Sequence, residues 1–251
     1  MSNDTEQYII DGIASYLRIG TDQIKIISRL GTDDSTSDID ILIKNISTSG
    51  KISWWKFEES LWNGTVGEVK DSISSSNNAT STGAVVNVGW GKIGNSGYFD
   101  GSSYIIVVDD TRLQIDEGTI SLWFRTPVDN TSIDNILISK ANCYKIAMNT
   151  NEKITAYNYS TSTTYTSQSS KTYNDSEWHH IAFVFKSGTG FKLYIDAVLE
   201  TSGDITFGNK TTHQILIGSG WDYGGWVGSI DEVAMWNRQL TELEISALYG
   251  G

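Results

Sequence analysis

The stretch WHHIAFVFKSGTGFKLYID, residues 178–196, decides the class of fold. It holds two runs of β-branched and aromatic residues, 179–186 and 190–195, separated by Ser and Gly, which is typical of two strands joined by a turn. Similar runs occur on both sides of it, at 52–57, 104–108, 118–125, 136–139, 145–149, 153–159, 214–218 and 229–237. Many short strands with no long helices between them predict an all-β, two-sheet antiparallel sandwich.

Two segments have helical features. At residues 240–248, Thr241 and Glu244 form a capping-box pattern, apolar residues supply one side, and Gly250 follows as a stop. Residues 6–19 place Ile and Leu at helical spacing, but their Val, Ile and Tyr content makes a strand equally possible. We therefore expect a short C-terminal helix and leave the N-terminal segment open.

A domain boundary is predicted near residues 45–51, where Ser47-Thr48-Ser49-Gly50 is typical of a linker. Residues 1–50 contain two strand-like runs, 23–30 and 38–46, and are too few for an independent core. They are predicted to be a β-rich accessory segment packed on the sandwich, or the remnant of an upstream module, and residues 51–251 are predicted to be the main sandwich domain.

The charge balance excludes some partners. The formal net charge of the 251-residue chain is −12, whereas nucleic acids and anionic membranes are bound through clustered Lys and Arg. No apolar stretch reaches the length of a membrane span.

Cys143 is the single cysteine, so no internal disulfide is possible, and we expect it to be buried. Residues 1–7 do not resemble a signal peptide, so an extracellular location implies a trimmed chain, a longer parent or another export route, and a virion needs no signal.

Asn-x-Ser/Thr triplets are frequent. They begin at Asn3, Asn45, Asn63, Asn78, Asn130, Asn158, Asn174 and Asn209. Either the chain has a composition rich in Asn, Ser and Thr, or it is a glycosylated surface protein. The sequence leaves both alternatives open.

Six motifs follow one another in order from residue 52 to the end. They are WWKFEE (54–59), GKIGNSGYFDG (91–101), GTISLWF (118–124), WHHI (178–181), LYID (193–196) and GSIDEVAMWN (228–237). In this order and spacing the sequence resembles the laminin-G-like jelly-rolls of the concanavalin A-like lectin and glucanase superfamily. It departs from the family pattern at Gly97, where Ala is common, and at Ala197, which replaces a turn glycine.

The resemblance and the strand pattern together predict the core. Large hydrophobic residues on the expected strands should fill the space between the sheets: Trp123, Phe124, Trp178, Phe183, Phe185 and Trp236. His179 and His180 are neighbours on one strand and should point to opposite faces, so a structural role is preferred to a shared metal site. His213 stands alone and carries no signal.

Catalysis is disfavoured. Retaining glycoside hydrolysis needs two carboxylates about 5–5.5 Å apart, and the Glu-x-Asp-x-x-Glu strand of the laminarinase-like enzymes is absent from the sequence. Asp231 and Glu232 are adjacent on an expected strand and should face opposite ways, so they do not form a catalytic pair. The sequence also contains no lipase, metalloprotease or phosphate-loop motif. A glycoside hydrolase is the least favoured function.

A binding module needs aromatic platforms and polar groups on a rim. The Gly-rich loop 218–228, with Trp221, Asp222 and Tyr223, is the best candidate, and Trp62 and Trp90 in other polar stretches are added. The alternative is that these aromatics cover the ends of the core, as we expect for Trp226. The favoured function is a non-catalytic carbohydrate-binding or adhesion module on an extracellular or virion surface, with a glycan or glycosylated surface as partner. The alternative is a structural virion or surface-layer component that contacts other subunits.

The resemblance also implies a structural Ca²⁺ between the first and last strands of the domain. It places Glu58 beside Asp231 as ligands, with Asp100 as a weaker third, and Ca²⁺ prefers such oxygen ligands. The alternative is that Asp231 caps a turn and Glu58 is solvated. A zinc site is disfavoured, because the lone cysteine and the histidines lack ligand spacing.

Overall fold

A computed structural model describes residues 49–127, 134–159, 164–204, 211–220 and 224–250. Residues Gly50–Gln239 form one compact unit, and Leu240–Gly251 belong to a second unit that is described separately. The predictions for residues 6–19, 23–30 and 38–46 lie outside the described residues. Within the described part, no helix is both long and apolar enough to cross a bilayer.

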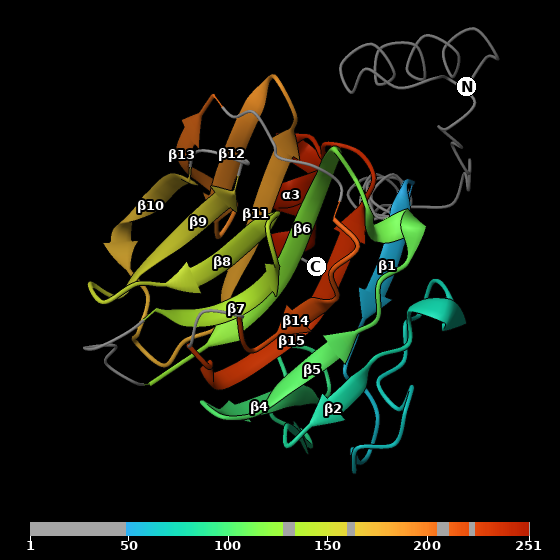
Figure 1. The fold of residues 1–251 in the computed structure, drawn as a ribbon. Helices are drawn as coiled ribbons and strands as arrows, with labels where there is room; N and C mark the ends of the chain where they lie inside the picture. Colours follow the sequence, from blue (N-terminus) through green and yellow to red (C-terminus); the bar gives the residue numbers. More distant parts are fainter. Residues whose placement is uncertain (1–48, 128–133, 160–163, 205–210, 221–223, 251) are drawn as a thin grey trace, which may run out of the picture. The chain divides into compact units, whose positions relative to one another are not determined.

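The compact unit is a sandwich of two antiparallel sheets, which Figure 1 shows as stacked layers. In the described residues one sheet has eight strands, in the order β13 (Val198–Gly203), β12 (Gly190–Ile195), β11 (His179–Lys186), β6 (Glu117–Arg125), β15 (Val227–Trp236), β4 (Ser96–Asp100) and β3 (Val85–Asn87), with β1 (Lys51–Trp55) also paired to β15. The other has seven, in the order β10 (Thr164–Thr172), β9 (Lys153–Tyr159), β8 (Tyr144–Met148), β7 (Asn135–Lys140), β14 (Ile215–Ile217), β5 (Tyr104–Val107) and β2 (Thr80–Thr82). The predicted sandwich is confirmed.

Cross-strand pairs line the core between the sheets. In the eight-stranded sheet Ile120 pairs with Phe183 and Met235, and all three are buried. In the seven-stranded sheet Ile217 pairs with Ile138 and Ile105 at the opposing face. Side chains of alternate residues therefore meet between the layers, as the strand period of two requires.

The predicted core was partly wrong. Phe124, Phe183 and Phe185 belong to the core between the sheets. Trp123, although buried, pairs with His180 and Asp231 on the opposite face of its sheet, since residue 124 takes the inner position. Trp178 is only half-buried. Trp236 is fully buried, but it does not belong to the hydrophobic core between the two sheets.

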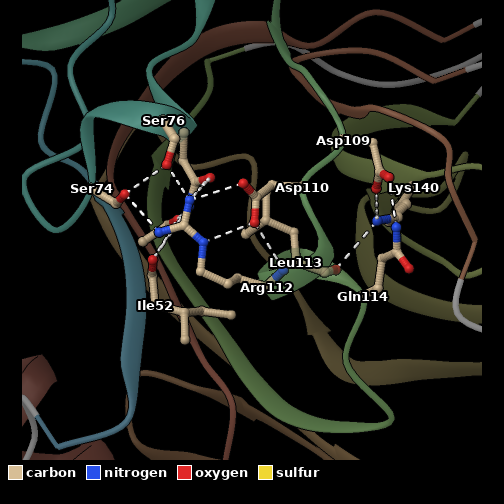
Figure 2. Close-up of polar contacts among 11 residues, drawn as sticks. Ile52, Ser74, Ser76, Asp109, Asp110, Arg112, Leu113, Gln114 and Lys140 are labelled. Carbon is tan, nitrogen blue, oxygen red and sulfur yellow. Dashed lines mark hydrogen bonds and ion pairs between the residues drawn. The ribbon is translucent and has the colours of Figure 1, made fainter.

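Two polar clusters fix short segments beside the sheets (Figure 2). The Arg112 guanidinium donates from Nε to Asp110 at 2.8 Å and from one terminal nitrogen to Ser74 Oγ at 2.7 Å. It thereby joins the 3₁₀ turn η3 (Thr111–Leu113) to the segment before η2 (Ser75–Asn77). Lys140, almost fully buried, donates to Asp109 at 2.9 Å. Both cations have structural partners.

The C-terminal helix α3 spans Glu242–Gly250. Its capping box is formed as predicted: the Glu244 backbone N–H donates to Thr241 Oγ1 at 3.3 Å, and the Thr241 backbone N–H donates to Glu244 Oε2 at 2.8 Å. These reciprocal bonds satisfy backbone donors at the helix start.

Candidate functional site

Strand β15 is irregular at Asp231 and Glu232, where the main predicted metal ligand lies. Its pairing with β6 shifts register between Asp231 and Ala234, and Glu232 takes a left-handed backbone conformation with φ of 53°. On its other edge β15 pairs first with β4, through residues 227–230, and then with β1, through residues 233–236. The irregular residues therefore lie opposite the gap between β4 and β1, where a bulge redirects side chains.

Asp231 and Glu58 hold the same loop, residues 91–95. The Ile93 backbone N–H donates to Asp231 Oδ2 at 3.1 Å, and the Asn95 backbone N–H donates to Glu58 Oε2 at 3.3 Å. The Asn95 side chain also donates to the Glu58 carbonyl at 3.4 Å. Two residues 173 positions apart in the sequence thus converge on one short loop.

The carboxyl group of Asp231 is fully buried. Burial raises its pKa to about 8, and the charge of Glu232 contributes in the same direction, against the lowering effect of the Ile93 N–H. Glu232 turns to a different partner, because its Oε2 accepts from the indole of Trp54 at 2.6 Å. A buried carboxylate of this kind favours a proton or a cation beside it.

Asp100, the third predicted ligand, is not brought to this place. It pairs with Val227, at the far end of β4 from Asp231. Its Oδ1 accepts from the backbone N–H groups of Ser102 and Ser103, at 2.9 and 3.0 Å, and these and the Ser102 hydroxyl lower its pKa to about 2. Among the described residues no group of three or more His, Cys, Asp or Glu side chains is arranged to hold a metal.

The aromatic residues that were predicted to bind sugar differ in their exposure to solvent. The prediction that Trp62 is exposed was wrong, because its side chain is buried. Its ring meets that of Phe57 edge-on at a centroid distance of 5.2 Å, and its Nε1 donates to Glu59 at 3.1 Å. The polar residues beside Trp62 in the sequence suggested an exposed loop, whereas its ring belongs to the hydrophobic core. Trp90 is exposed, with 63% of its surface accessible. Trp221, Asp222 and Tyr223 lie outside the described residues.

The base of the loop that carries residues 221–223 is firmly held. Gly218 donates from its backbone N–H to Leu137 at 2.8 Å and accepts from Trp226 at 2.9 Å, which closes the loop at its neck. Ser139 Oγ donates to the Ser219 carbonyl at 2.9 Å. Trp226 is fully buried in the core, as predicted. The loop therefore leaves β14 and leads into β15, and contacts with β7 fix both of its ends, since the Ile136 N–H also donates to the Gly224 carbonyl at 3.3 Å.

A polar cluster of Lys145, Asp134 and Tyr157 lies beside this loop base, and we call it the β7–β9 cluster. Lys145 pairs with Ser139 on β7 and with Tyr157 on β9, whereas its neighbour Ile146 enters the core. Lys145 Nζ lies 3.5 Å from Asp134 Oδ2 and 4.1 Å from the centre of the Tyr157 ring, and the Tyr157 hydroxyl donates to Asp134 at 2.6 Å. The cluster thus occupies the outer face of the seven-stranded sheet.

The β7–β9 cluster was not predicted from the sequence. The available signal was Lys145, the one charged residue in the otherwise apolar strand YKIAM. A lysine that is almost buried on a strand needs a carboxylate or a ring beside it, and here it has both. Its partners lie 11 and 12 residues away on either side, so local pattern analysis did not group them.

The histidines of the WHHI motif point to opposite faces, as predicted. His180 is buried, its Nε2 lies 2.8 Å from Ser121 Oγ, and burial lowers its pKa to about 4. His179 lies between Asp196 and Asp175, at 2.7 and 3.0 Å. Cys143 is buried, and burial raises the pKa of its thiol to about 11.

Solved structures share the fold at low sequence identity. Domain 4 of AbnA, an extracellular arabinanase from Geobacillus stearothermophilus solved with arabinotriose, is 20% identical with a TM-score of 0.61, and the match covers 79% of this chain and 98% of that domain. The binding domain of Paraclostridial Mosquitocidal Protein 1 is 19% identical with a TM-score of 0.61, over 78% of this chain and 52% of the other. The receptor binding domain of botulinum neurotoxin C/D mosaic serotype is 17% identical with a TM-score of 0.61, over 80% and 51%.

The toxin domains are therefore matched over about half of their length, whereas the arabinanase domain is matched almost completely. Comparison with curated protein sequences gives no significant match. A laminin-G family model, described as the concanavalin A-like lectin/glucanases superfamily, matches residues 99–246, which is more than half of the chain. The chain therefore belongs to the concanavalin A-like lectin/glucanase superfamily.

Proposed function

We propose that this chain is a non-catalytic module that binds glycans on an extracellular or virion surface. The observation that supports this most is the β7–β9 cluster, which places an ammonium group, a carboxylate and a phenol together on the outer face of the seven-stranded sheet. Sugar hydroxyls both donate and accept hydrogen bonds, and these three groups offer both functions at fixed positions. The arabinotriose complex of AbnA domain 4 shows that one protein of this fold binds a sugar oligomer.

The site would combine the cluster with the neighbouring loop. The Ser139 and Gly218 contacts fix the base of the loop beside β7. Trp221, Asp222 and Tyr223 in that loop remain the proposed aromatic and polar contacts, and exposed Trp90 remains a separate candidate. Trp62 is withdrawn, because its ring is buried.

A glycan array followed by calorimetry tests the proposal. We expect the wild type to bind a sugar and Lys145→Ala to bind it at least about tenfold more weakly, since a polar contact contributes about 1.4 kcal/mol or more. Lys186→Ala is the matched control, because Lys186 pairs with Glu117 on the other sheet. Failure of the wild type to bind any sugar would favour the structural alternative, and hydrolysis of a polysaccharide would contradict a non-catalytic role.

We also propose that a structural Ca²⁺ binds at Asp231 and Glu58. The residues fit a hard cation, because Asp231 is a fully buried carboxylate that accepts hydrogen bonds from the backbone N–H groups of Ile93 and Glu232, and Glu58 holds the same loop. The ion would supply positive charge to this buried carboxylate. Backbone carbonyls and water would complete its ligands.

Thermal melting with EDTA and with added CaCl₂ tests the ion. A ligand present at a hundredfold excess over its Kd stabilises the folded state by about 2.7 kcal/mol, so the wild-type midpoint should rise with CaCl₂. Asp231→Asn should abolish the rise, whereas Asp100→Asn should retain it, because Asp100 lies at the far end of β4. An unchanged wild-type midpoint would contradict the calcium proposal and leave the glycan proposal untouched.

A further inference from the structure

Asn63 and Gly64 form the only Asn-Gly pair in the sequence. Both residues are exposed, and Gly64 has φ of +86°, a left-handed conformation that favours glycine. The pair also begins the triplet Asn63-Gly64-Thr65, one of the eight glycosylation patterns. These residues belong to neither the proposed glycan site nor the proposed calcium site.

The carboxylate of Glu68 accepts hydrogen bonds from the backbone N–H groups of this pair. Its Oε1 accepts the Gly64 N–H at 2.8 Å, and its Oε2 accepts the Asn63 N–H at 2.7 Å. The Glu68 N–H donates back to the Thr65 carbonyl at 3.1 Å, so the turn that carries the carboxylate is closed. These distances lie within the reach that a general base needs for the proton it removes.

The side-chain carbonyl of Asn63 receives two donors. Thr65 donates to Asn63 Oδ1 from its hydroxyl at 2.6 Å and from its backbone N–H at 3.1 Å. Donors aimed at a carbonyl oxygen stabilise the negative charge that develops there when the carbon is attacked. A base on the Gly64 nitrogen and donors on the Asn63 carbonyl therefore act on the two reacting groups of one turn.

We propose that Asn63 is a self-modification site, at which the chain converts its own asparagine to a succinimide and then to aspartate or isoaspartate. The Gly64 nitrogen bonds to Asn63 Cγ while Glu68 takes the proton from that nitrogen. The bond from Cγ to the side-chain nitrogen breaks, and this nitrogen takes a proton and leaves as ammonia. Water then adds to one of the two ring carbonyls and opens the ring.

The product differs from the starting turn in charge and in shape. It adds one negative charge to a chain whose net charge is −12, directly beside the Glu68 carboxylate. Like charges this close repel each other, so Glu68 loses its position on the turn. The reaction also removes the asparagine that a glycosylating enzyme would require at this triplet.

Peptide mapping by mass spectrometry with isoaspartate detection tests the proposal on the full chain at neutral pH. The reference is a synthetic peptide of residues 61–70, which has the same sequence without the fold. We expect Asn63 in the folded chain to react at least about tenfold faster than in the peptide, because a positioned base contributes about a hundredfold or more. An equal or slower rate in the folded chain would overturn the proposal, since the turn would then protect Asn63.

Two variants separate the base from the stability of the turn. Glu68→Gln should lower the rate toward that of the peptide. Glu59→Gln is the matched control, because the Glu59 carboxylate in the same segment accepts from the Trp62 indole and the Lys70 N–H instead of from Asn63 and Gly64. A rate that Glu68→Gln leaves unchanged, or that both variants lower equally, would refute the role of Glu68.

Discussion

His179 is held between two carboxylates and makes the stability of the fold depend on pH. Its Nδ1 lies 2.7 Å from Asp196 and its Nε2 lies 3.0 Å from Asp175. A neutral imidazole donates only one hydrogen bond, so both contacts are hydrogen bonds only when the ring is protonated. Burial lowers the pKa of His179, but the bonds to Asp196 and Asp175 outweigh burial and raise it above the ordinary value of 6.5.

The perturbation is His179→Phe, which keeps an aromatic ring beside Phe124 and Tyr173 and removes the charge. The bond to Asp196, whose side chain is 25% exposed, is worth about 1.5–3 kcal/mol as a charge-assisted hydrogen bond. Asp175 is 55% exposed, so solvent screening limits its bond to about 0.5 kcal/mol. The variant should therefore lose about 2–3 kcal/mol of unfolding free energy where His179 is protonated.

The sign with pH follows from the raised pKa. The stabilising contribution of His179 is fully present below its unfolded value of 6.5 and is lost as the pH rises through the folded value. Denaturant unfolding at about pH 6 and about pH 9 measures it. The gap between wild type and His179→Phe should shrink to about 1 kcal/mol at the higher pH, since a neutral ring still donates one bond.

The control is Asp175→Asn, which should cost less than about 1 kcal/mol at either pH, because Asp175 is largely exposed. The Tyr173 ring lies edge-on to the His179 ring, its hydroxyl donates to Glu200 at 2.9 Å, and burial together with this hydrogen bond raises the pKa of Tyr173 well above its ordinary value of 10. It therefore does not titrate in this range. A gap between wild type and His179→Phe that stays constant from about pH 6 to about pH 9 would refute the reasoning.

Three further substitutions test the packing. Ile217→Ala should lower the free energy of unfolding by about 3–4 kcal/mol in urea, because Ile217 is fully buried in the core, and a loss under about 1 kcal/mol would contradict that placement. Gly225→Ala should lower the free energy of unfolding by about 2 kcal/mol, because the new Cβ would lie 1.9 Å from the Gly101 carbonyl oxygen. An unchanged melting midpoint in calorimetry would contradict this clash. Lys140→Met should cost about 2 kcal/mol by leaving Asp109 without its buried cation, and a more stable variant in thermal melting would show that the pair costs more than it contributes.

The strands with strong local patterns could be predicted from the sequence. Residues 179–186 and 190–195 became β11 and β12 with the predicted bounds, because β-branched and aromatic residues suit an extended, half-buried backbone. The helix start at Thr241 was also predictable, since a capping box is formed by two residues only three positions apart in the sequence, here Thr241 and Glu244. Such features depend only on neighbours in the chain.

Strands without such a pattern were missed. β10 reads TYTSQSSKT, and β13 reads VLETSG, so neither has the apolar alternation of a buried strand. They are strands because β9 and β12 offer unpaired backbone groups at an edge. Tertiary pairing, rather than side-chain preference, decides their conformation.

The sequence by itself determined the sandwich and its family motifs, and it also identified Asp231 and Glu58 as two carboxylates of interest. Only the tertiary structure decided what lies beside each side chain. It buried Trp62, moved Asp100 away from Asp231, and brought Lys145 to Asp134 and Tyr157. The physical reason is that the pairing of distant strands and the closure of loops set these contacts, and a local side-chain pattern does not specify which distant segments become neighbours.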